Sequence, residues 1–140
     1  MAGSSHSITS QRFPRRDNYP IGQVVTAFVG DDSDGTVPDL SFTLPFDAEL
    51  LSIITNPGAT GPTDNYDIVV NDPNGLDVLQ GVGANRDTAN TEEAAIVLAS
   101  TSLHPIVLAD TTLTIVISNT SVNDATGTIT IRYRRADRRA

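Results

Sequence analysis

The sequence predicts an all-β fold, specifically an antiparallel two-sheet sandwich of jelly-roll type with extended basic arms at its N- and C-terminal ends. From residue 23 onward, short apolar runs of strand length alternate with clusters of Gly, Pro, Asp and Asn. Where the runs show a clear period, that period is two, which is the side-chain period of a β-strand. The 140-residue chain has no cysteine, so packing and sheet hydrogen bonds must stabilise it without disulfides.

The chain divides into three parts by composition. Residues 1–20 are rich in Ser, carry three arginines and contain few apolar residues, which favours an extended arm that orders on contact with other surfaces. The strand-like runs occupy residues 21–134, which we expect to form one β-sandwich domain. Residues 135–140 form a basic tail.

Nine strands are expected within the central part, from their β-branched and aromatic residues and from the turn residues that separate them. They are 23–29, 40–44, 49–55, 65–71, 77–79, 94–99, 106–108, 112–118 and 128–134. In the last two, apolar and polar residues alternate, so each has one face for the core and one for solvent. Only residues 88–99 offer a helical pattern.

The turns between these strands follow known chemistry. Residues 31–35, 56–58, 72–75 and 123–127 supply Gly, Asn, Asp and Pro, which tolerate positive φ or fix φ near −65°. The pair Asn74-Gly75 is the strongest hairpin signal in the chain.

The turn at 31–35 also invites comparison with a calcium loop. Asp31, Asp32 and Asp34 precede Gly35, and closely spaced carboxylates suit a hard cation. However, the position where a calcium loop needs its bidentate glutamate is Ser41. We therefore expect a solvated acidic turn, with a cation site as the alternative left open.

Charge is segregated along the chain, because all nine basic residues are arginine and eight lie in the end segments. Between residues 18 and 131 there are fifteen carboxylates and only Arg86, a formal charge of −14. Arginine binds carboxylates through a planar fork, so the ends are expected to dock on protein. The predicted contact residues are Arg12, Phe13, Arg15, Arg16, Arg132, Arg134, Arg135, Arg138 and Arg139.

Direct nucleic-acid binding is disfavoured, since the acidic body repels phosphate and aromatic residues for base stacking are few.

No catalytic, cofactor-binding or metal-ligating residues are predicted. The chain has two histidines, His6 and His104, and no lysine, which leaves a cupin-type metal site and Schiff-base chemistry without their residues. It has no Trp, three Tyr and four Phe, so aromatic platforms for sugars are also scarce.

No segment is apolar enough for a secretory signal or a membrane span, and we expect a protein of the cytoplasm with no membrane partner.

Three segments carry a resemblance to a known class of protein: YDIVVND at 66–72, GLDVLQGVGANR at 75–86 and GTITIRY at 127–133. Over about residues 64–134 the chain resembles small β-structured virion proteins of tailed bacteriophages, most closely capsid cement (decoration) proteins of jelly-roll type. This resemblance implies a non-enzymatic protein on the capsid exterior, assembled in the host cytoplasm. Its partners would be the major capsid protein, whose neighbouring subunits it clamps against DNA pressure, and itself, as a homo-oligomer with a dimer favoured over a trimer.

Two other functions are compatible with the same sequence. The first is another virion position, such as a neck component, a tail component or a head-fibre base. The second is a soluble β-sandwich module that binds a glycan or another ligand. A virion protein would be found in purified particles, whereas a glycan module would bind sugar as an isolated domain.

Overall fold

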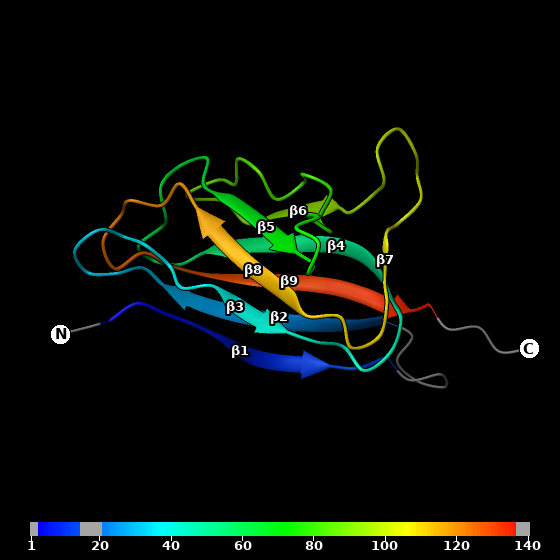
Figure 1. Cartoon of the computed structure of the whole chain (residues 1–140). Helices are drawn as coiled ribbons and strands as arrows, with labels where there is room; N and C mark the ends of the chain where they lie inside the picture. Colours follow the sequence, from blue (N-terminus) through cyan, green and yellow to red (C-terminus); the bar gives the residue numbers. More distant parts are fainter. Residues whose placement is uncertain (1–2, 15–20, 137–140) are drawn as a thin grey trace, which may run out of the picture.

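The computed structural model describes residues 3–14 and 21–136, which form nine strands in two antiparallel sheets (Figure 1). The strands are β1 (Ser5–Arg12), β2 (Ile21–Val29), β3 (Leu40–Phe42), β4 (Ala48–Pro57), β5 (Asp67–Asn71), β6 (Glu92–Ala95), β7 (Ile106–Val107), β8 (Leu113–Ser118) and β9 (Thr126–Arg135). The predicted all-β sandwich is confirmed. In these two stretches we find no helix, and therefore none that could cross a membrane.

The strands are shared between a large and a small sheet. The large sheet has the order β1-β2-β9-β4-β6, with β7 also paired to β4, and the small sheet has the order β3-β8-β5. From β2 onward the chain crosses between the sheets: β2, β4, β6, β7 and β9 lie in one, and β3, β5 and β8 in the other. This alternation is the jelly-roll pattern, and it brings β9 beside β2 from the far end of the chain.

The core lies between the two sheets. Alternate residues of the large sheet, such as Phe28, Ile53 and Ile129, face alternate residues of the small sheet, such as Ile68 and Ile115, and all five are buried. Two sheets packed in this way interleave their inner side chains in a layer about 10 Å thick. The period-two pattern of the sequence therefore sets which residues enter the core.

Eight of the nine predicted strands overlap observed strands, and the expected strand at 77–79 is wrong. That segment makes only an isolated bridge, Asn71 to Asp77. The Asp77 carboxylate accepts hydrogen bonds from the backbone amides of Val70, Leu79 and Gly81, each at 3.0 Å. A carboxylate that binds neighbouring amides competes with a sheet ladder and holds the segment as a turn. The helical pattern at 88–99 is also wrong, because part of it is β6.

The N-terminal segment adds a strand that the sequence pattern did not predict. Residues 5–12 form β1, which pairs antiparallel with β2, with a bulge between Ile8 and Ser10. His6 fastens β1 to the sandwich: its Nδ1 lies 3.1 Å from the Pro38 carbonyl and its Nε2 lies 3.0 Å from Thr26 Oγ1. The segment is extended but lies on the sheet of its own chain. The division into parts 1–20, 21–134 and 135–140 stays a prediction.

Replacing Ile129 by Ala should lower the free energy of unfolding by about 2–5 kcal/mol, because it opens a cavity in a fully buried site. The neighbouring Thr128→Ala removes a side chain from the outer face of the same strand and should cost less than about 1 kcal/mol. Urea unfolding measures both. Equal losses would show that the two faces of β9 have been assigned wrongly.

Candidate interaction surfaces

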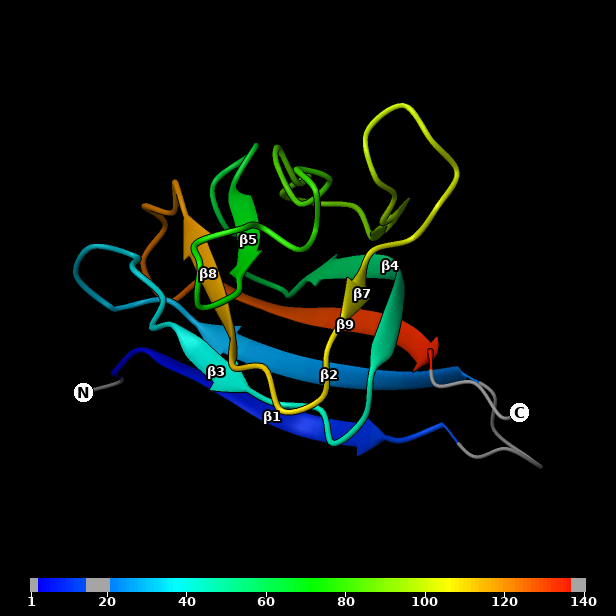
Figure 2. The ribbon, with the colours of Figure 1, turned by 45° about the vertical axis from the view of Figure 1, so that its right-hand side comes forward.

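The two ends of the chain meet at one end of the large sheet. Across the ladder, Arg12 pairs in register with Gln23, and Gln23 with Arg132. In the adjoining row, Ile21 pairs with Arg134. The tips of β1 and β9 accordingly lie at the same end of the molecule, where β2 begins (Figure 2). Sequence reasoning placed these arginines in two separate arms, whereas the sheet register brings them together.

We call this region the basic end, and define it by Arg12, Phe13, Arg132, Arg134 and Arg135. These five belong to the nine contact residues that the sequence suggested. The other four, Arg15, Arg16, Arg138 and Arg139, lie outside the residues that the structure describes. Arg132 and Arg134 point outward from β9, as the alternation of its side chains predicted.

An aromatic cluster holds the basic end in place. The ring of Phe46 lies 5.8 Å from that of Phe13 and 5.9 Å from that of Tyr133. The guanidinium carbon of Arg135 lies 5.0 Å from the centre of the Phe46 ring, within range of a cation–π interaction. Tyr133 donates a hydrogen bond to the Arg12 carbonyl at 3.2 Å. Burial raises the pKa of Tyr133 to about 12, so the phenol stays a donor at neutral pH.

Gly22 makes room for this arrangement. A Cβ at position 22 would lie 2.6 Å from the Arg12 carbonyl oxygen, 2.6 Å from Pro14 Cδ and 2.9 Å from Tyr133 Cε2. Two of these neighbours belong to the N-terminal segment itself. Glycine is therefore needed because the backbone of that segment crosses β2 at close range.

Two ion pairs lie on the outer face of the large sheet. Arg132 is 3.5 Å from Glu93, and Arg134 pairs with Glu49. The arginine side chains are 44% and 50% exposed, and exposed pairs contribute about 0–1 kcal/mol. Because each pair is weak, either arginine can exchange its partner for a carboxylate of another protein at little cost.

Beyond the basic end, the outer face of the large sheet carries no charged side chain in the middle rows of β2, β9 and β4. Val25, Thr130 and Ile54 form one row across β2, β9 and β4, and Ala27 and Thr128 lie in the next. All five are partly buried by their neighbours in the sheet. The alternation in residues 128–134 predicted a mostly polar solvent face, and Thr128 and Thr130 lie on it, whereas Val25, Ala27 and Ile54 make the neighbouring strands apolar. The β-branched residues on both faces of the 23–29 run were the signal that could have revealed this flatter, less polar surface.

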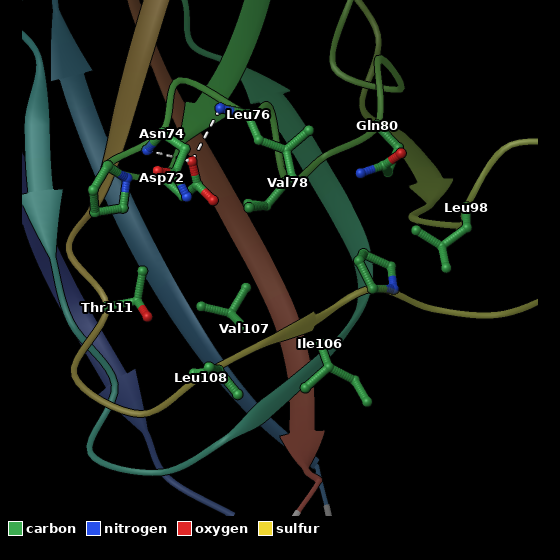
Figure 3. A pocket seen from close by; sticks show the side chains of 12 residues that line it. Asp72, Asn74, Leu76, Val78, Gln80, Leu98, Ile106, Val107, Leu108 and Thr111 are labelled. Atoms are coloured by element: carbon green, nitrogen blue, oxygen red, sulfur yellow. Dashed lines mark hydrogen bonds between the residues drawn. The ribbon is translucent and has the colours of Figure 1, made fainter.

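An apolar groove lies on the side of the large sheet that is far from β1, between the 72–80 loop and β7. Its volume is about 560 Å³. Leu76 and Val78 form one wall, and Ile106 and Leu108 lie across from them, with Leu98 at the side (Figure 3). Leu76, Ile106 and Leu108 are more than half exposed. We keep the name apolar groove for these residues; sequence reasoning did not identify it.

The acidic turn at 31–35 is organised by its own carboxylates. Asp31 Oδ1 accepts hydrogen bonds from the amide of Ser33 at 2.8 Å and from its hydroxyl at 2.5 Å, and these bonds lower the pKa of Asp31. Asp34 accepts from the amide and the hydroxyl of Thr36. Within residues 3–14 and 21–136, no group of three or more His, Cys, Asp or Glu side chains could hold a metal ion.

The two histidines are far apart and both contact backbone carbonyls. His6 lies on β1 beside Phe28, with the rings 6.1 Å apart and nearly perpendicular. His104 precedes β7, and its Nδ1 lies 2.7 Å from the Ile96 carbonyl. Each ring is engaged in holding a chain segment in place.

Acidification should weaken the fold through His6. Burial is the main cause that lowers its pKa below 6.5, against the opposing effects of the Pro38 carbonyl and the Asp39 charge. The unfolded chain then binds the proton more readily, so stability is full above pH 6.5 and falls as the pH drops towards the folded-state pKa. Urea unfolding at pH 7.5 and 5.5 measures this loss. His6→Gln, which cannot titrate, should show a smaller one; an equal loss would assign the pH effect to other groups.

Gly22→Ala should loosen the N-terminal segment, because the added methyl group displaces the backbone around Arg12 and Pro14. We expect faster amide exchange in β1 and faster tryptic cleavage after Arg12 than in the unaltered protein. Gly3→Ala is the matched control, since a Cβ there meets nothing within 4 Å. Unchanged exchange in Gly22→Ala would contradict the close approach.

No protein-family model and no curated protein matches the sequence. Among solved structures, a chain of the cyanophage Pam1 capsid asymmetric unit is similar in shape, with a TM-score of 0.47 and 19% sequence identity. The match covers 82% of this chain and 83% of that one.

Proposed function

We propose that this protein is a non-enzymatic virion structural protein that binds the outer surface of a phage capsid and cements neighbouring subunits of the major capsid protein. The observation that carries the proposal is the basic end, where arginines from both ends of the chain gather on a rigid sheet. The rest of the molecule is strongly acidic. The sequence resemblance to jelly-roll cement proteins supports the same role.

The physical basis is a rigid body with one basic contact region. Arg132 and Arg134 project from a strand that is paired on both sides, so their backbone is already ordered and only side-chain entropy is lost when they bind. Their partners would be carboxylates on the shell, bound through the planar guanidinium fork. Each contact is weak, but many copies on one lattice, linked as a homo-oligomer, would hold firmly through avidity.

The jelly-roll architecture also occurs in lectins and cupins, and fold alone does not decide between them. A cupin-type metal site needs several converging ligands, whereas both histidines of this chain are used in separate structural contacts. A glycan site usually presents aromatic faces. Of the six aromatic residues that the structure describes, five are buried and only Phe13 is exposed.

Another virion position, such as a neck or tail component, is the second candidate, because the basic end suits any acidic protein surface.

Copy number on purified particles tests the proposal. Particles assembled with the protein should carry it in near-stoichiometric ratio to the major capsid protein, measured by quantitative gel densitometry. Particles assembled without it should release DNA at a lower temperature. A handful of copies per particle would support a neck or tail position, and absence from particles would reject a virion role.

Neutralising the arginines tests the contact region. The double variant Arg132→Gln/Arg134→Gln should lower shell affinity at least about tenfold, which corresponds to about 1.4 kcal/mol, and should reduce its salt dependence. The matched control, Glu49→Gln/Glu93→Gln, breaks the same two ion pairs but leaves both arginines, and should bind the shell as well as or better than the unaltered protein. Equal losses in both double variants would contradict a role for the arginines.

Substitution is a sharper test than deletion of the end segments. Removing residues 1–20 would also remove β1, and with it the ladder to β2 and the contact of His6 with Thr26. Loss of binding after deletion could then reflect loss of the fold.

A further inference from the structure

The strand register decides which side chains share the outer face of the large sheet, the face turned away from the small sheet. Two neighbouring rows across β1, β2, β9 and β4 consist entirely of uncharged side chains that are small or β-branched. They are Ser10, Val25, Thr130 and Ile54 in one row and Ser7, Ala27, Thr128 and Asn56 in the other. We call these eight residues the neutral centre.

Within residues 3–14 and 21–136, no second layer packs on the neutral centre. On the core side of the same strands, Phe28 and Ile129 are at most 1% exposed. On the outer side, Val25, Ala27 and Thr128 are only partly buried. The small sheet lies across the opposite face (Figure 2). The outer face is therefore a sheet face that this chain leaves uncovered.

This face also differs in charge from the rest of the molecule. Fifteen carboxylates lie between residues 18 and 131, but in the strand rows of the outer face there are only two, Glu49 and Glu93. Each is paired with an arginine of β9, Glu49 with Arg134 and Glu93 with Arg132. The strands of this face therefore carry no unpaired carboxylate, although the chain as a whole has a charge of −8.

This distribution of charge is typical of a docking face. The centre of a protein interface is depleted in charged residues, and its rim is polar. The neutral centre has no charge that must be desolvated, and its short side chains lose little rotamer freedom on contact. Arg132 and Arg134, at one end of the same face, can then recognise carboxylates at the margin.

The outer face has a suitable size. The nine residues of β2 extend over about 30 Å, and the five strands from β1 to β6 extend over about 20 Å. The face therefore covers about 600 Å² before side chains at its margin are counted. An ordinary stable interface buries about 800 Å² per partner. One sheet face can thus supply most of such a contact.

We propose that the outer face of the large sheet lies flat on the shell of major capsid protein. The neutral centre contacts an uncharged, nearly planar part of the shell, and Arg132 and Arg134 contact shell carboxylates beside it. The small sheet points away from the shell. This inference rests on the proposed capsid role, and it adds the orientation of the molecule and a contact surface beyond the basic end.

The absence of cysteine allows the orientation to be measured directly. Thr128→Cys places a single thiol in the neutral centre, on a strand paired on both sides. The matched control, Thr114→Cys, places one on the outward side of β8, the middle strand of the small sheet; both threonines are partly buried. On particles, a maleimide should alkylate the Thr128→Cys thiol at least about tenfold more slowly than in the free protein, because reaction requires release from the shell. The Thr114→Cys thiol should react at the same rate in both states.

A charge placed in the neutral centre tests whether the contact is needed. Thr128→Glu should lower shell affinity at least about tenfold, because its carboxylate would be desolvated without a partner. Thr114→Glu adds the same charge on the small sheet and should bind like the unaltered protein. Thermal unfolding checks that both variants are folded, and the cysteine measurement decides if either is not.

Three results would overturn the orientation while the capsid role stands. They are a Thr128→Cys thiol that reacts as fast on the particle as in solution, a Thr114→Cys thiol protected as well as or better than that of Thr128→Cys, and full shell affinity of a folded Thr128→Glu variant. If the unaltered protein does not bind particles at all, the capsid role fails, and the orientation fails with it.

Discussion

The structure depends on the position of β9, which is hydrogen-bonded to β2 on one side and to β4 on the other along nearly its whole length. β9 comes last in the described chain and β2 near its beginning, so this pairing joins residues as far apart as Val24 and Ile131. Such non-local pairing is entropically costly and typical of slowly folding β-sandwiches. The pairing also determines where the basic residues lie, because it carries Arg132, Arg134 and Arg135 to the end of the sheet where β1 finishes and β2 begins.

A bulge in β4 also influences which side chains reach the surface. Its register shifts between Leu50 and Ser52, and the extra residue, Leu51, accepts a hydrogen bond from the amide of Ile96. The shift separates the part of β4 that pairs with β7 from the part that pairs with β6. The chain between β6 and β7 therefore leaves the sheet, and its apolar residues reach the margin of the groove. Bulges commonly bend a strand and redirect its side chains in this way.

The acidity of the body has a structural cause as well as a functional consequence. Asp31, Asp72, Asp77 and Asp87 each accept hydrogen bonds from backbone amides two to four residues further on. Carboxylates are favoured there because they hold tight turns. A sandwich with many such turns becomes acidic in its loops. Of the five arginines that the structure describes, all but Arg86 lie near strand ends. The same turn chemistry thus separates the acidic loops from the arginines that the proposed contact with the shell would use.

The sequence by itself determined the fold class and eight of the strands, because side-chain alternation and turn residues act within a few positions of one another. It also determined that Arg132 and Arg134 face outward. It did not reveal β1, whose Ser-rich run has no apolar alternation and is held by contacts of His6 with Thr26 and Pro38. Only the tertiary structure decided that both chain ends share one basic end and that an apolar groove opens at the opposite edge of the sheet. The physical reason is that both features come from pairing between strands far apart in the chain, which no local pattern encodes.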